Sequence, residues 1–494
     1  MRRLIFGSII SLIAFGSALK INAQNCQDLR YIDSMFDVNT TFNIEFQQAR
    51  PYGSLFNQAY RLNLYQPEDD TLSHRPLMIF QFGGGYLIGD RLLPPAPEFC
   101  TYWAERGFVV ASIDYRLGFS ALNQGSAERA VYRGVQDLQA ALRYLCEFNE
   151  TYGIDTNNII VSGNSAGAFT TLHSTFMEQN QAPASYQGFG IGLDSYSLGG
   201  IYESGNTYWG NREVKVHGII ANWGSILDTT FIGDAPDDNV ATILFHGTED
   251  DLVPYVYGQP FDSPFFPEVY GSVPIAERLA NTTIPHKFVR LIGAGHEPEL
   301  LNPAYLDTIL WESTPFMYEH VLKPQIQSVN GLTSPLLNST ATYTVIANEP
   351  IIQVCAIATN GTVVSTNQNQ FEVLWTTPGL DTLQVIAGNE ILAYDTIYVP
   401  ISVTSLTGVE ESESEKVAII QPNVFSDFTT IRFSEEPRSN ATLVITNVLG
   451  QTVFTETVSF DQLAVNANQL GKGCFLAYLE EKHHRQFIGR LVVQ

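Results

Sequence analysis

The sequence Gly-Asn-Ser-Ala-Gly at residues 163–167 constrains the fold more than any other stretch of this 494-residue chain. Apolar residues 159–161 precede it, and a helix-compatible segment, residues 168–177, follows it. A strand that enters a tight Gly-x-Ser-x-Gly turn and leaves as a helix holds the serine hydroxyl out at the strand's C-terminal end, as a nucleophile requires. The glycines fit because a Cβ there would collide with neighbouring backbone. Chance alone produces the pattern in roughly one of five or six chains of this length, so other motifs must support it.

Residues 24–324 alternate between short apolar runs and amphipathic helical stretches, a pattern typical of a mostly parallel sheet covered by helices. The predicted strands are residues 60–65, 77–82, 108–113, 159–161, 216–221, 241–245 and 287–291. We therefore predict a doubly wound α/β domain. Because the C-terminal ends of parallel strands meet at one edge of a sheet, the loops after these strands should carry the functional groups.

Three consecutive glycines, residues 83–85, follow the predicted strand 77–82 directly. Glycines at such a place let backbone N–H groups converge on one point without interference from side chains, as an oxyanion hole requires. A phosphate-binding loop is the alternative, but it would need a lysine and a helix N-terminus immediately afterwards, and neither follows. The glycines therefore favour an oxyanion-binding loop.

An acidic loop, residues 246–251 (His-Gly-Thr-Glu-Asp-Asp), follows the predicted strand 241–245. An acid just past the end of a parallel strand lies on the same edge as the nucleophile. We predict that Asp250 is this acid. Glu249 and Asp251 are expected to be solvated, and His246 is expected to pack or bond locally.

A histidine, His296, lies in a loop of small residues after the predicted strand 287–291. The chain order Ser165, Asp250, His296 is the order in which the α/β-hydrolase fold supplies its nucleophile, acid and base. His173 is a rival base, but it lies two turns down the helix and away from the edge. The sequence therefore predicts a Ser165–His296–Asp250 triad.

Residues 60–320 resemble the α/β-hydrolase superfamily, and within it the hormone-sensitive-lipase-like and carboxylesterase-like bacterial esterases. The motifs that carry the resemblance lie at residues 82–86, 114–117, 152–155, 163–167, 246–250 and 295–296. Phe82 and Asn164 depart from the frequent histidine and the frequent acidic residue of those families. The resemblance implies an acyl-enzyme mechanism in which the N–H groups of Gly84 and Gly85, together with that of Ala166, form the oxyanion hole.

The amino-acid composition and the hydrophobic pattern change after residue 324. Residues 325–404 are rich in Thr, Val, Ile and Asn, and their alternating strands predict an immunoglobulin-like β-sandwich. No cluster of Asp, Glu or His lies there, which favours a spacer or carbohydrate-contacting module. Residues 405–416 form a predicted acidic linker.

Residues 417–494 form a second small β-rich unit. It resembles the C-terminal sorting domain of the bacterial type IX secretion system through the segments at residues 421–426, 429–433, 443–451, 470–475 and 490–494. Val424 and the pair Cys474-Phe475 depart from that family's pattern. The resemblance implies that the type IX machinery is a partner, and that release or surface attachment follows, usually with removal of this domain.

Residues 1–23 combine a basic start, an apolar core and small residues near the end, as a secretory signal peptide does. A membrane anchor is the alternative, but the apolar core of about 16 residues is shorter than the roughly 20 that span a bilayer. We therefore predict no stable transmembrane segment, and a secreted or cell-surface protein that passes through the periplasm.

The formal net charge of −25 excludes a polyanion such as nucleic acid as a partner. No Cys/His spacing matches a metal site, and we predict no metal and no cofactor. Five cysteines are too few and too scattered for a disulfide scaffold. Cys26 and Cys100 are the pair to test first, and Cys146 is expected to be a buried free thiol.

Together these features predict a secreted serine carboxylic-ester hydrolase, with acyl or feruloyl groups of polysaccharides as candidate substrates. A peptidase of the prolyl-oligopeptidase branch shares the triad, but no propeller-like segment precedes the hydrolase pattern. A non-catalytic adhesion protein on a hydrolase scaffold is a further alternative, against which the intact triad argues.

The substrate pocket should be walled by the loops at residues 86–102, 116–122 and 253–270, because each follows a strand end. The last of these loops is rich in Tyr and Phe, which could bind sugars or aromatic acyl groups. Core packing explains at least half of these rings. Residues 179–213 follow the nucleophile helix, so the topology places them mostly away from the pocket.

Overall fold

A computed structural model of the chain describes residue 26 and residues 29–120, 122–188, 194–233, 239–405, 418–434, 441–481 and 484–494. The predicted signal peptide, residues 1–23, lies outside the described residues. So does the predicted acidic linker, apart from residue 405. The chain divides into two compact units, residues 1–405 and 406–494.

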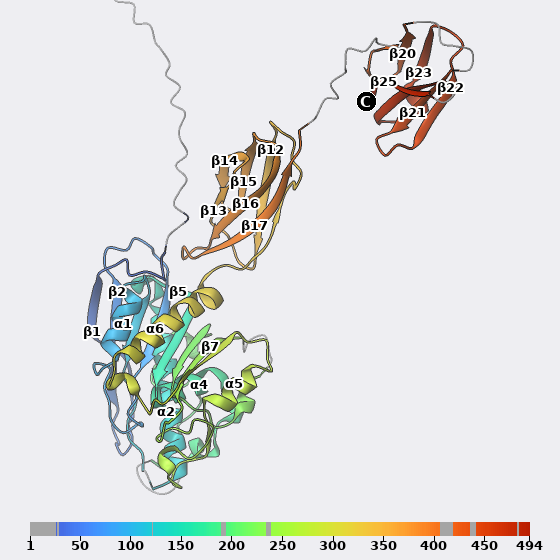
Figure 1. Cartoon of the computed structure of the whole chain (residues 1–494). Helices are drawn as coiled ribbons and strands as arrows, with labels where there is room; N and C mark the ends of the chain where they lie inside the picture. Colours follow the sequence, from blue (N-terminus) through green and yellow to red (C-terminus); the bar gives the residue numbers. More distant parts are fainter. Residues whose placement is uncertain are drawn as a thin grey trace, which may run out of the picture. The chain divides into compact units, whose positions relative to one another are not determined.

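An eight-stranded sheet forms the centre of the first unit, as the alternating apolar runs predict (Figure 1). Its spatial order is β1 (Val38–Ala49), β2 (Gln58–Pro67), β4 (Val109–Ile113), β3 (Arg75–Gln81), β5 (Ile154–Asn164), β6 (Gly218–Asn222), β7 (Ala241–Gly247), β10 (His286–Leu291). The strands from β4 to β10 run parallel, whereas β1 and β2 are antiparallel to their neighbours. The sequence prediction missed β1, whose polar residues alternate only weakly with apolar ones.

Helices cover both faces of this sheet because successive side chains of each strand point to opposite faces. One face packs on α1 (Ala96–Ala104) and α6 (Ala304–Met317), and the other on α2 (Gln124–Glu147), α4 (Ala166–Phe176) and α5 (Ser272–Leu279). The strand β3 shows the division plainly, since Met78 and Phe80 lie in the first core and Leu77 and Ile79 in the second. This is the doubly wound arrangement that the sequence predicts.

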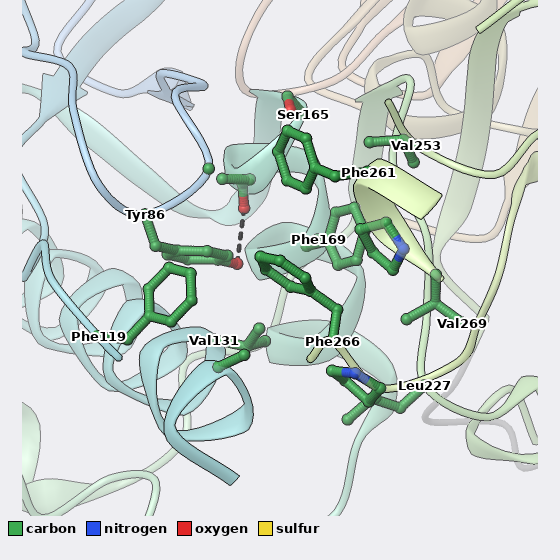
Figure 2. Close-up of a pocket in the computed structure, with 15 residues that line it drawn as sticks. Tyr86, Phe119, Val131, Ser165, Phe169, Leu227, Val253, Phe261, Phe266 and Val269 are labelled. Carbon is green, nitrogen blue, oxygen red and sulfur yellow. Dashed lines mark hydrogen bonds between the residues drawn. The ribbon is translucent and has the colours of Figure 1, made fainter. Parts of the chain in front are cut away.

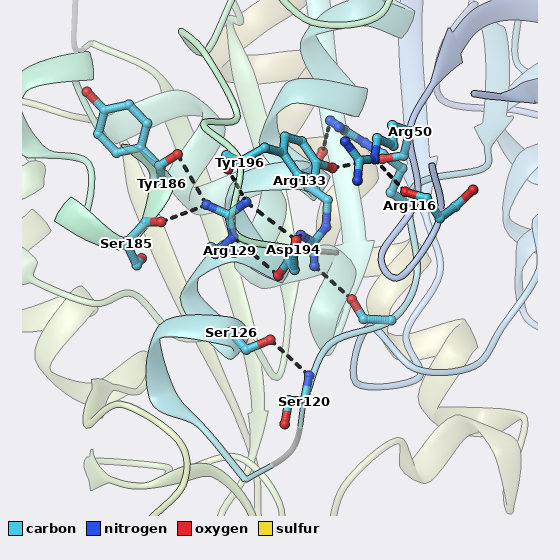
Figure 3. A network of polar contacts seen from close by, with 12 residues as sticks. Arg50, Arg116, Ser120, Ser126, Arg129, Arg133, Ser185, Tyr186, Asp194 and Tyr196 are labelled. Atoms are coloured by element: carbon cyan, nitrogen blue, oxygen red, sulfur yellow. Dashed lines mark hydrogen bonds and ion pairs between the residues drawn. The ribbon is translucent and has the colours of Figure 1, made fainter. Parts of the chain in front are cut away.

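The described residues of the segment 179–213 pack on α2 through a buried network of arginines (Figure 3). Arg133 Nη1 lies 2.9 Å from Asp194 Oδ1, and Arg129 Nε lies 3.2 Å from Asp194 Oδ2. Arg133 Nη2 also donates to the carbonyl of Gly118 at 2.7 Å. Because Phe119 follows Gly118 and lines the pocket described below, the network links this segment to a pocket wall.

Residues 326–403 form a β-sandwich that belongs to the first unit. One sheet contains β11 (Ile326–Asn330), β12 (Thr340–Ala347), β15 (Gln370–Trp375) and β14 (Gly361–Asn367); the other contains β13 (Gln353–Ile357), β16 (Gly379–Gly388) and β17 (Tyr394–Val403). A separate apolar core fills the space between the sheets. The immunoglobulin-like assignment of this sandwich stays a prediction.

The turn between β16 and β17 inserts into the core of the hydrolase domain. Ile391 and Ala393 belong to the same buried cluster as residues of the central sheet. Tyr31, which is fully buried, donates its hydroxyl to the carbonyl of Ile391 at 2.7 Å, and Tyr318 donates to the carbonyl of Tyr394 at 3.0 Å. The sandwich is therefore a packed part of the first unit.

A disulfide joins Cys26 to Cys355 of β13 across 329 residues of sequence. The Cys26–Cys100 pairing chosen for the first test is therefore wrong. Cys100 lies fully buried on α1 in the hydrolase core as a free thiol, and the buried Cys26 is bonded to Cys355 instead. Cys146 is a buried free thiol, as predicted.

Residues 418–494 fold as the second unit, with two sheets around a core of their own. One sheet contains β18 (Ala418–Gln421), β20 (Phe428–Phe433) and β23 (Gln462–Asn466); the other contains β19 (Val424–Phe425), β25 (His484–Val493), β24 (Gly473–Glu481), β21 (Thr442–Asn447) and β22 (Thr452–Thr457). A short helix, α7 (Ala467–Leu470), follows β23. This is the small all-β architecture that the sequence predicts.

Among the described residues, no helix has the length and apolar character needed to cross a bilayer. The same residues contain no group of three or more His, Cys, Asp or Glu side chains that could hold a metal ion.

Candidate active site

Ser165 lies on a strained turn between β5 and α4. Its backbone has φ 49° and ψ −118°, a region that residues with a side chain rarely adopt. The flanking glycines permit the turn, because a Cβ at Gly163 would overlap the backbone of Gly167, and a Cβ at Gly167 would overlap the carbonyl of Gln81. The turn thus has the strand–nucleophile–helix geometry that the sequence predicts.

Ser165, His296 and Asp250 form a continuous hydrogen-bonded chain. His296 Nε2 lies 2.9 Å from Ser165 Oγ, and His296 Nδ1 lies 2.7 Å from Asp250 Oδ2. Each residue follows the C-terminal end of a parallel strand: Ser165 follows β5, Asp250 follows β7 and His296 follows β10. The fold therefore brings together three residues that are far apart in the sequence. The chain can carry a proton away from the serine hydroxyl while the carboxylate holds the imidazole in place.

Asp250 is held as a carboxylate by four donors. Its side chain is completely buried, which opposes ionisation, but hydrogen bonds from His246 and His296 outweigh this effect and hold the pKa of Asp250 far below its usual range. The backbone N–H groups of Leu252 and Val253 donate to Oδ1 at 2.9 and 2.8 Å. Asp250 therefore faces His296 as an ionised carboxylate at neutral pH.

His246 bonds locally, as the sequence predicts, and its partner is the acid of the site. Its side chain is fully buried, with Nε2 3.2 Å from Asp250 Oδ2 and Nδ1 2.8 Å from the hydroxyl of Ser272. His246 and His296 thus contact the same carboxylate oxygen, and His246 helps to orient the acid. The spacing of four residues between His246 and Asp250 in one tight loop is the only sequence signal for this contact.

The glycine loop after β3 lies against the nucleophile. Gly84 and Gly85 have φ values of 103° and 61°, and a Cβ on Gly83 would lie 3.2 Å from the Cβ of Ser165. Within the described part of the chain, the backbone N–H groups of Gly84, Gly85 and Ala166 donate to no protein acceptor. These are the three groups that the sequence and the resemblance select for an oxyanion hole.

An apolar pocket opens beside Ser165 (Figure 2). It encloses about 570 Å³, including the open volume at its mouth. Its lining residues are Gly85, Tyr86, Phe119, Ala127, Val131, Ser165, Ala166, Phe169, Leu227, Val253, Pro260, Phe261, Phe266, Pro267 and Val269.

The three predicted wall loops all contribute to this pocket, through Tyr86, Phe119 and the segment from Val253 to Val269. None of the described residues of 179–213 lines it, as predicted. The prediction missed the contributions of α2, α4 and Leu227, because helix residues that line a pocket have the same apolar spacing as residues that fill a core.

Buried side chains form a chain of hydrogen bonds at Asn164, the residue that precedes the nucleophile. Asn164 Nδ2 donates to Glu299 Oε1 at 2.7 Å, and Asn222 Nδ2 donates to Asn164 Oδ1 at 2.8 Å. Burial raises the pKa of Glu299 to about 8, and the neighbouring Glu297 adds to the shift. Glu299 therefore carries a proton at neutral pH. Asn164, which stands where related enzymes have an acid, suits this neutral carboxyl.

The structure places the remaining candidate residues, His173, Glu249 and Asp251, away from the hydroxyl of Ser165. His173 is buried in α4, where Nδ1 contacts the carbonyl of Phe169 at 2.7 Å and Nε2 accepts from the N–H of Leu227 at 3.1 Å. Burial lowers the pKa of His173 to about 4. Its two ring nitrogens are thus engaged away from Ser165. Glu249 and Asp251 are exposed on the loop, as predicted.

A doubly wound sheet with a strained serine turn and a Ser–His–Asp chain at one edge defines the α/β-hydrolase class. Residues 62–263 match the family model described as BD-FAE, and residues 420–494 match the model of the secretion system C-terminal sorting domain. The chain thus contains an esterase-like α/β-hydrolase domain and a type IX sorting domain, which implies export by that secretion machinery.

Several esterases and lipases are similar over part of this chain. Gut esterase 1 of Caenorhabditis elegans is 33% identical over 115 residues, which cover 23% of this chain and 20% of that protein. Lipase 2 of Moraxella sp. (strain TA144) is 31% identical over 118 residues, 22% of this chain and 25% of that protein. Carboxylesterase 3B of Mus musculus is 31% identical over 151 residues, 30% of this chain and 24% of that protein. The matched segment thus spans about a fifth to a quarter of these relatives.

Among solved structures, esterase 2 of Thermogutta terrifontis phosphoramylated by tabun has a TM-score of 0.39 and 22% sequence identity, covering 59% of this chain and 97% of that one. The same esterase with bound propionate has a TM-score of 0.38 and 22% identity, covering 55% of this chain and 94% of that one.

Proposed function

We propose that this protein is an exported serine carboxylic-ester hydrolase in which Ser165, His296 and Asp250 act as the triad. The observation that carries the proposal is the hydrogen-bonded chain from Asp250 through His296 to Ser165 Oγ, with distances of 2.7 and 2.9 Å. These distances are within the range expected for a base that takes up the proton of a hydroxyl. The pocket beside Ser165 supplies a place for the substrate.

In acylation, Ser165 Oγ attacks the ester carbonyl carbon while His296 Nε2 takes the hydroxyl proton. Asp250 accepts from Nδ1–H of His296, which fixes the tautomer and stabilises the imidazolium as it forms. Collapse of the tetrahedral intermediate breaks the bond to the alkoxy oxygen, to which His296 returns the proton. Water then attacks the acyl-enzyme by the same route, and the carboxylic acid leaves.

The oxyanion of the tetrahedral intermediate is placed among the N–H groups of Gly84, Gly85 and Ala166. Their lack of a protein acceptor among the described residues supports this assignment, because the N–H groups of the half-buried Gly84 and Gly85 are free to bind an oxyanion and that of the buried Ala166 would normally have a partner. Each such donor contributes roughly 3 to 4 kcal/mol to the stability of the transition state. Three donors are thus enough to account for a large share of the rate enhancement.

The sequence left two candidate acyl classes, simple acyl and feruloyl groups of polysaccharides. Five aromatic rings line the pocket, and rings of this kind can pack against aliphatic chains as well as aromatic groups. We place the enzyme outside the cell after passage through the periplasm. The sorting domain supports the export, and the sequence of residues 1–23 supports the periplasmic route.

The test compares the wild type with Ser165→Ala on 4-nitrophenyl butyrate and on a peptide 4-nitroanilide. We expect ester hydrolysis, and a loss on the order of 10⁶-fold in kcat in the variant. Ser174→Ala, which removes another buried serine of α4, is the matched control and should keep the activity.

Each alternative gives a distinct result in this assay. Ser165-dependent cleavage of the anilide but not of the ester would favour the peptidase. Turnover of neither substrate would favour the non-catalytic adhesion protein. Ester turnover that survives Ser165→Ala would contradict the mechanism.

A further inference from the structure

The lining of the pocket is almost wholly apolar, and this restricts the acyl groups that it can take. We propose that the pocket binds the acyl group of the substrate and selects acyl groups that carry no hydrogen-bonding substituent. The proposal rests on the serine-esterase function described above. It narrows the candidate substrates to aliphatic acyl esters and aromatic acyl esters without polar substituents, and it disfavours phenolic acyl groups such as feruloyl.

The pocket lies on the acyl side of Ser165. The departing alkoxy oxygen has to receive a proton from His296, so the alcohol portion of the ester lies toward that histidine. His296 does not line the pocket, whereas Gly85 and Ala166, two of the proposed oxyanion donors, do. A group bound in the pocket is therefore attached to the carbonyl on the side away from the leaving group.

Tyr86 carries the one side-chain hydroxyl of the lining besides that of the nucleophile, and this hydroxyl is already engaged. It donates to the carbonyl of Ala166 at 2.8 Å and lies 2.9 Å from Thr170 Oγ1 (Figure 2). Thr170 Oγ1 itself contacts the same carbonyl at 3.0 Å. The phenol is thus turned into the first turn of α4 and is not available to a ligand.

The end of the pocket opposite Ser165 consists of hydrocarbon side chains. In Figure 2, Ser165 lies at one end, and Val131, Phe266 and Leu227 lie at the other. The rings of Phe119 and Phe266 make an edge contact there, with centroids 5.7 Å apart. A hydroxyl at the distal end of a bound acyl group would therefore face hydrocarbon and find no side-chain hydrogen-bond partner to replace the water that it gives up. An ionised substituent would be excluded more strongly for the same reason.

The decisive comparison uses the methyl esters of 4-methylcinnamic and 4-hydroxycinnamic acids. The two substrates share the leaving group and nearly the same size, so they differ in the polarity of one substituent. After division by the rates of hydroxide-catalysed hydrolysis, we expect kcat/KM to favour the methyl compound by about 10- to 100-fold. A normalised ratio below about 10 overturns the proposal.

An aliphatic pair, ethyl hexanoate and ethyl 6-hydroxyhexanoate, repeats the test with a flexible chain. It decides the question if the pocket is too short for cinnamates, and the same threshold applies. Failure of the esterase function itself looks different, because then no ester is hydrolysed in a Ser165-dependent way. Turnover of both members of a pair at equal rates leaves the esterase function intact and removes only the selectivity.

Substitution of Leu227 tests where the substituent lies. Leu227→Asn introduces an amide at the distal end, and Leu227→Ala is the matched control that changes the size of the pocket without adding a polar atom. The ratio to follow is the normalised kcat/KM of the apolar ester divided by that of its hydroxylated partner, measured for whichever of the two pairs is hydrolysed faster. We expect Leu227→Asn to lower this ratio at least 3-fold, and Leu227→Ala to keep the preference for the apolar ester. A ratio that Leu227→Asn leaves unchanged contradicts the placement of the acyl group. Because each value is a ratio from one enzyme sample, partial misfolding of a variant does not affect it.

Discussion

The β-sandwich of residues 326–403 shares buried contacts with the hydrolase domain, whereas the sandwich of residues 418–494 forms a compact unit of its own. Both are small, both consist of two sheets around an apolar core, and both have short alternating strands. The first also has a disulfide to Cys26 and a turn that reaches the hydrolase core. Similar architectures thus serve different purposes in one chain.

The difference follows from a few residues. In the turn after β16, Ile391 and Ala393 are buried with hydrolase residues, and Asn389 donates to the carbonyl of Leu322 at 2.8 Å. Lys323 pairs with Asp395 at 2.9 Å just beyond the end of the hydrolase. We infer that the first sandwich stabilises the catalytic body. The second can be removed after export without loss of the catalytic fold, as the sorting-domain resemblance implies.

Truncation gives the largest expected effect. Removal of residues 406–494 should leave the melting temperature of the first unit and its kcat/KM unchanged. Removal of residues 325–494 exposes Tyr31, Tyr318 and Leu322 and should cost about 5 kcal/mol or more, since each large buried apolar side chain contributes about 1.5 to 3 kcal/mol. This loss is comparable to the whole stability of many domains. Thermal unfolding measures the stability of each truncated protein, and turnover of 4-nitrophenyl butyrate measures its activity. Equal melting temperatures for the two truncations would show that the first sandwich does not stabilise the hydrolase domain.

Loss of the Cys26–Cys355 disulfide should have the next largest effect. We expect Cys355→Ser to lower the free energy of unfolding of the first unit by about 2 to 5 kcal/mol, because the bond closes a long loop in the unfolded chain. The matched control is Cys474→Ser, which alters a free, half-buried cysteine of the second unit. Urea unfolding with and without reductant tests this, and reductant should lower the stability of the wild type but not that of Cys355→Ser. An unchanged midpoint in Cys355→Ser would show that the packed turn alone holds the first sandwich.

The pH dependence of stability should also separate the two units. Burial raises the pKa of Glu299 to about 8 from 4.5, so the folded first unit keeps a proton there that the unfolded chain releases. Its contribution to stability is complete below pH 4.5 and is lost as the pH rises toward 8. Between pH 5 and pH 8 the loss is about 3 kcal/mol.

Glu299→Gln keeps a neutral side chain of the same shape and should remove most of this slope. Among the described residues of the second unit, none is a buried carboxylate, so its unfolding transition should show no comparable slope. Calorimetric scans at pH 5, 6, 7 and 8 measure both transitions. The same slope in Glu299→Gln as in the wild type would assign the effect to another group.

The sequence was sufficient to predict the elements that follow general rules. Parallel strands read as apolar runs, and Ser165, Asp250 and His296 each follow such a run, so strand order alone brings them to one edge. The strand β1 was missed because its exposed face is polar and it lies at the edge of the sheet. The disulfide partner of Cys26 could not be found, because five scattered cysteines allow many pairings and the contact depends on how two domains pack.

The support around the triad was the other part that the sequence could not reveal. Glu299 contacts Asn164 across loops whose conformations no local pattern determines, whereas the contact between His246 and Asp250 is the local bonding that the sequence predicts. The same limit explains why the docked turn was missed. Ile391 lies in an ordinary turn sequence, and its burial depends on a surface to which residues as distant in the sequence as Tyr31 contribute.

The smallest predicted effect concerns the hydrogen bond from Tyr31 to the carbonyl of Ile391. Tyr31→Phe keeps the ring in the hydrolase core and leaves this buried carbonyl without its donor, which should cost about 1 kcal/mol. The change should appear only in the unfolding transition of the first unit, because the bond joins its two domains. Tyr478→Phe removes a hydroxyl from a half-buried tyrosine of the second unit and should change neither transition measurably. If Tyr31→Phe were as silent as Tyr478→Phe in calorimetry, apolar packing and the disulfide, without this polar contact, would hold the first sandwich on the hydrolase.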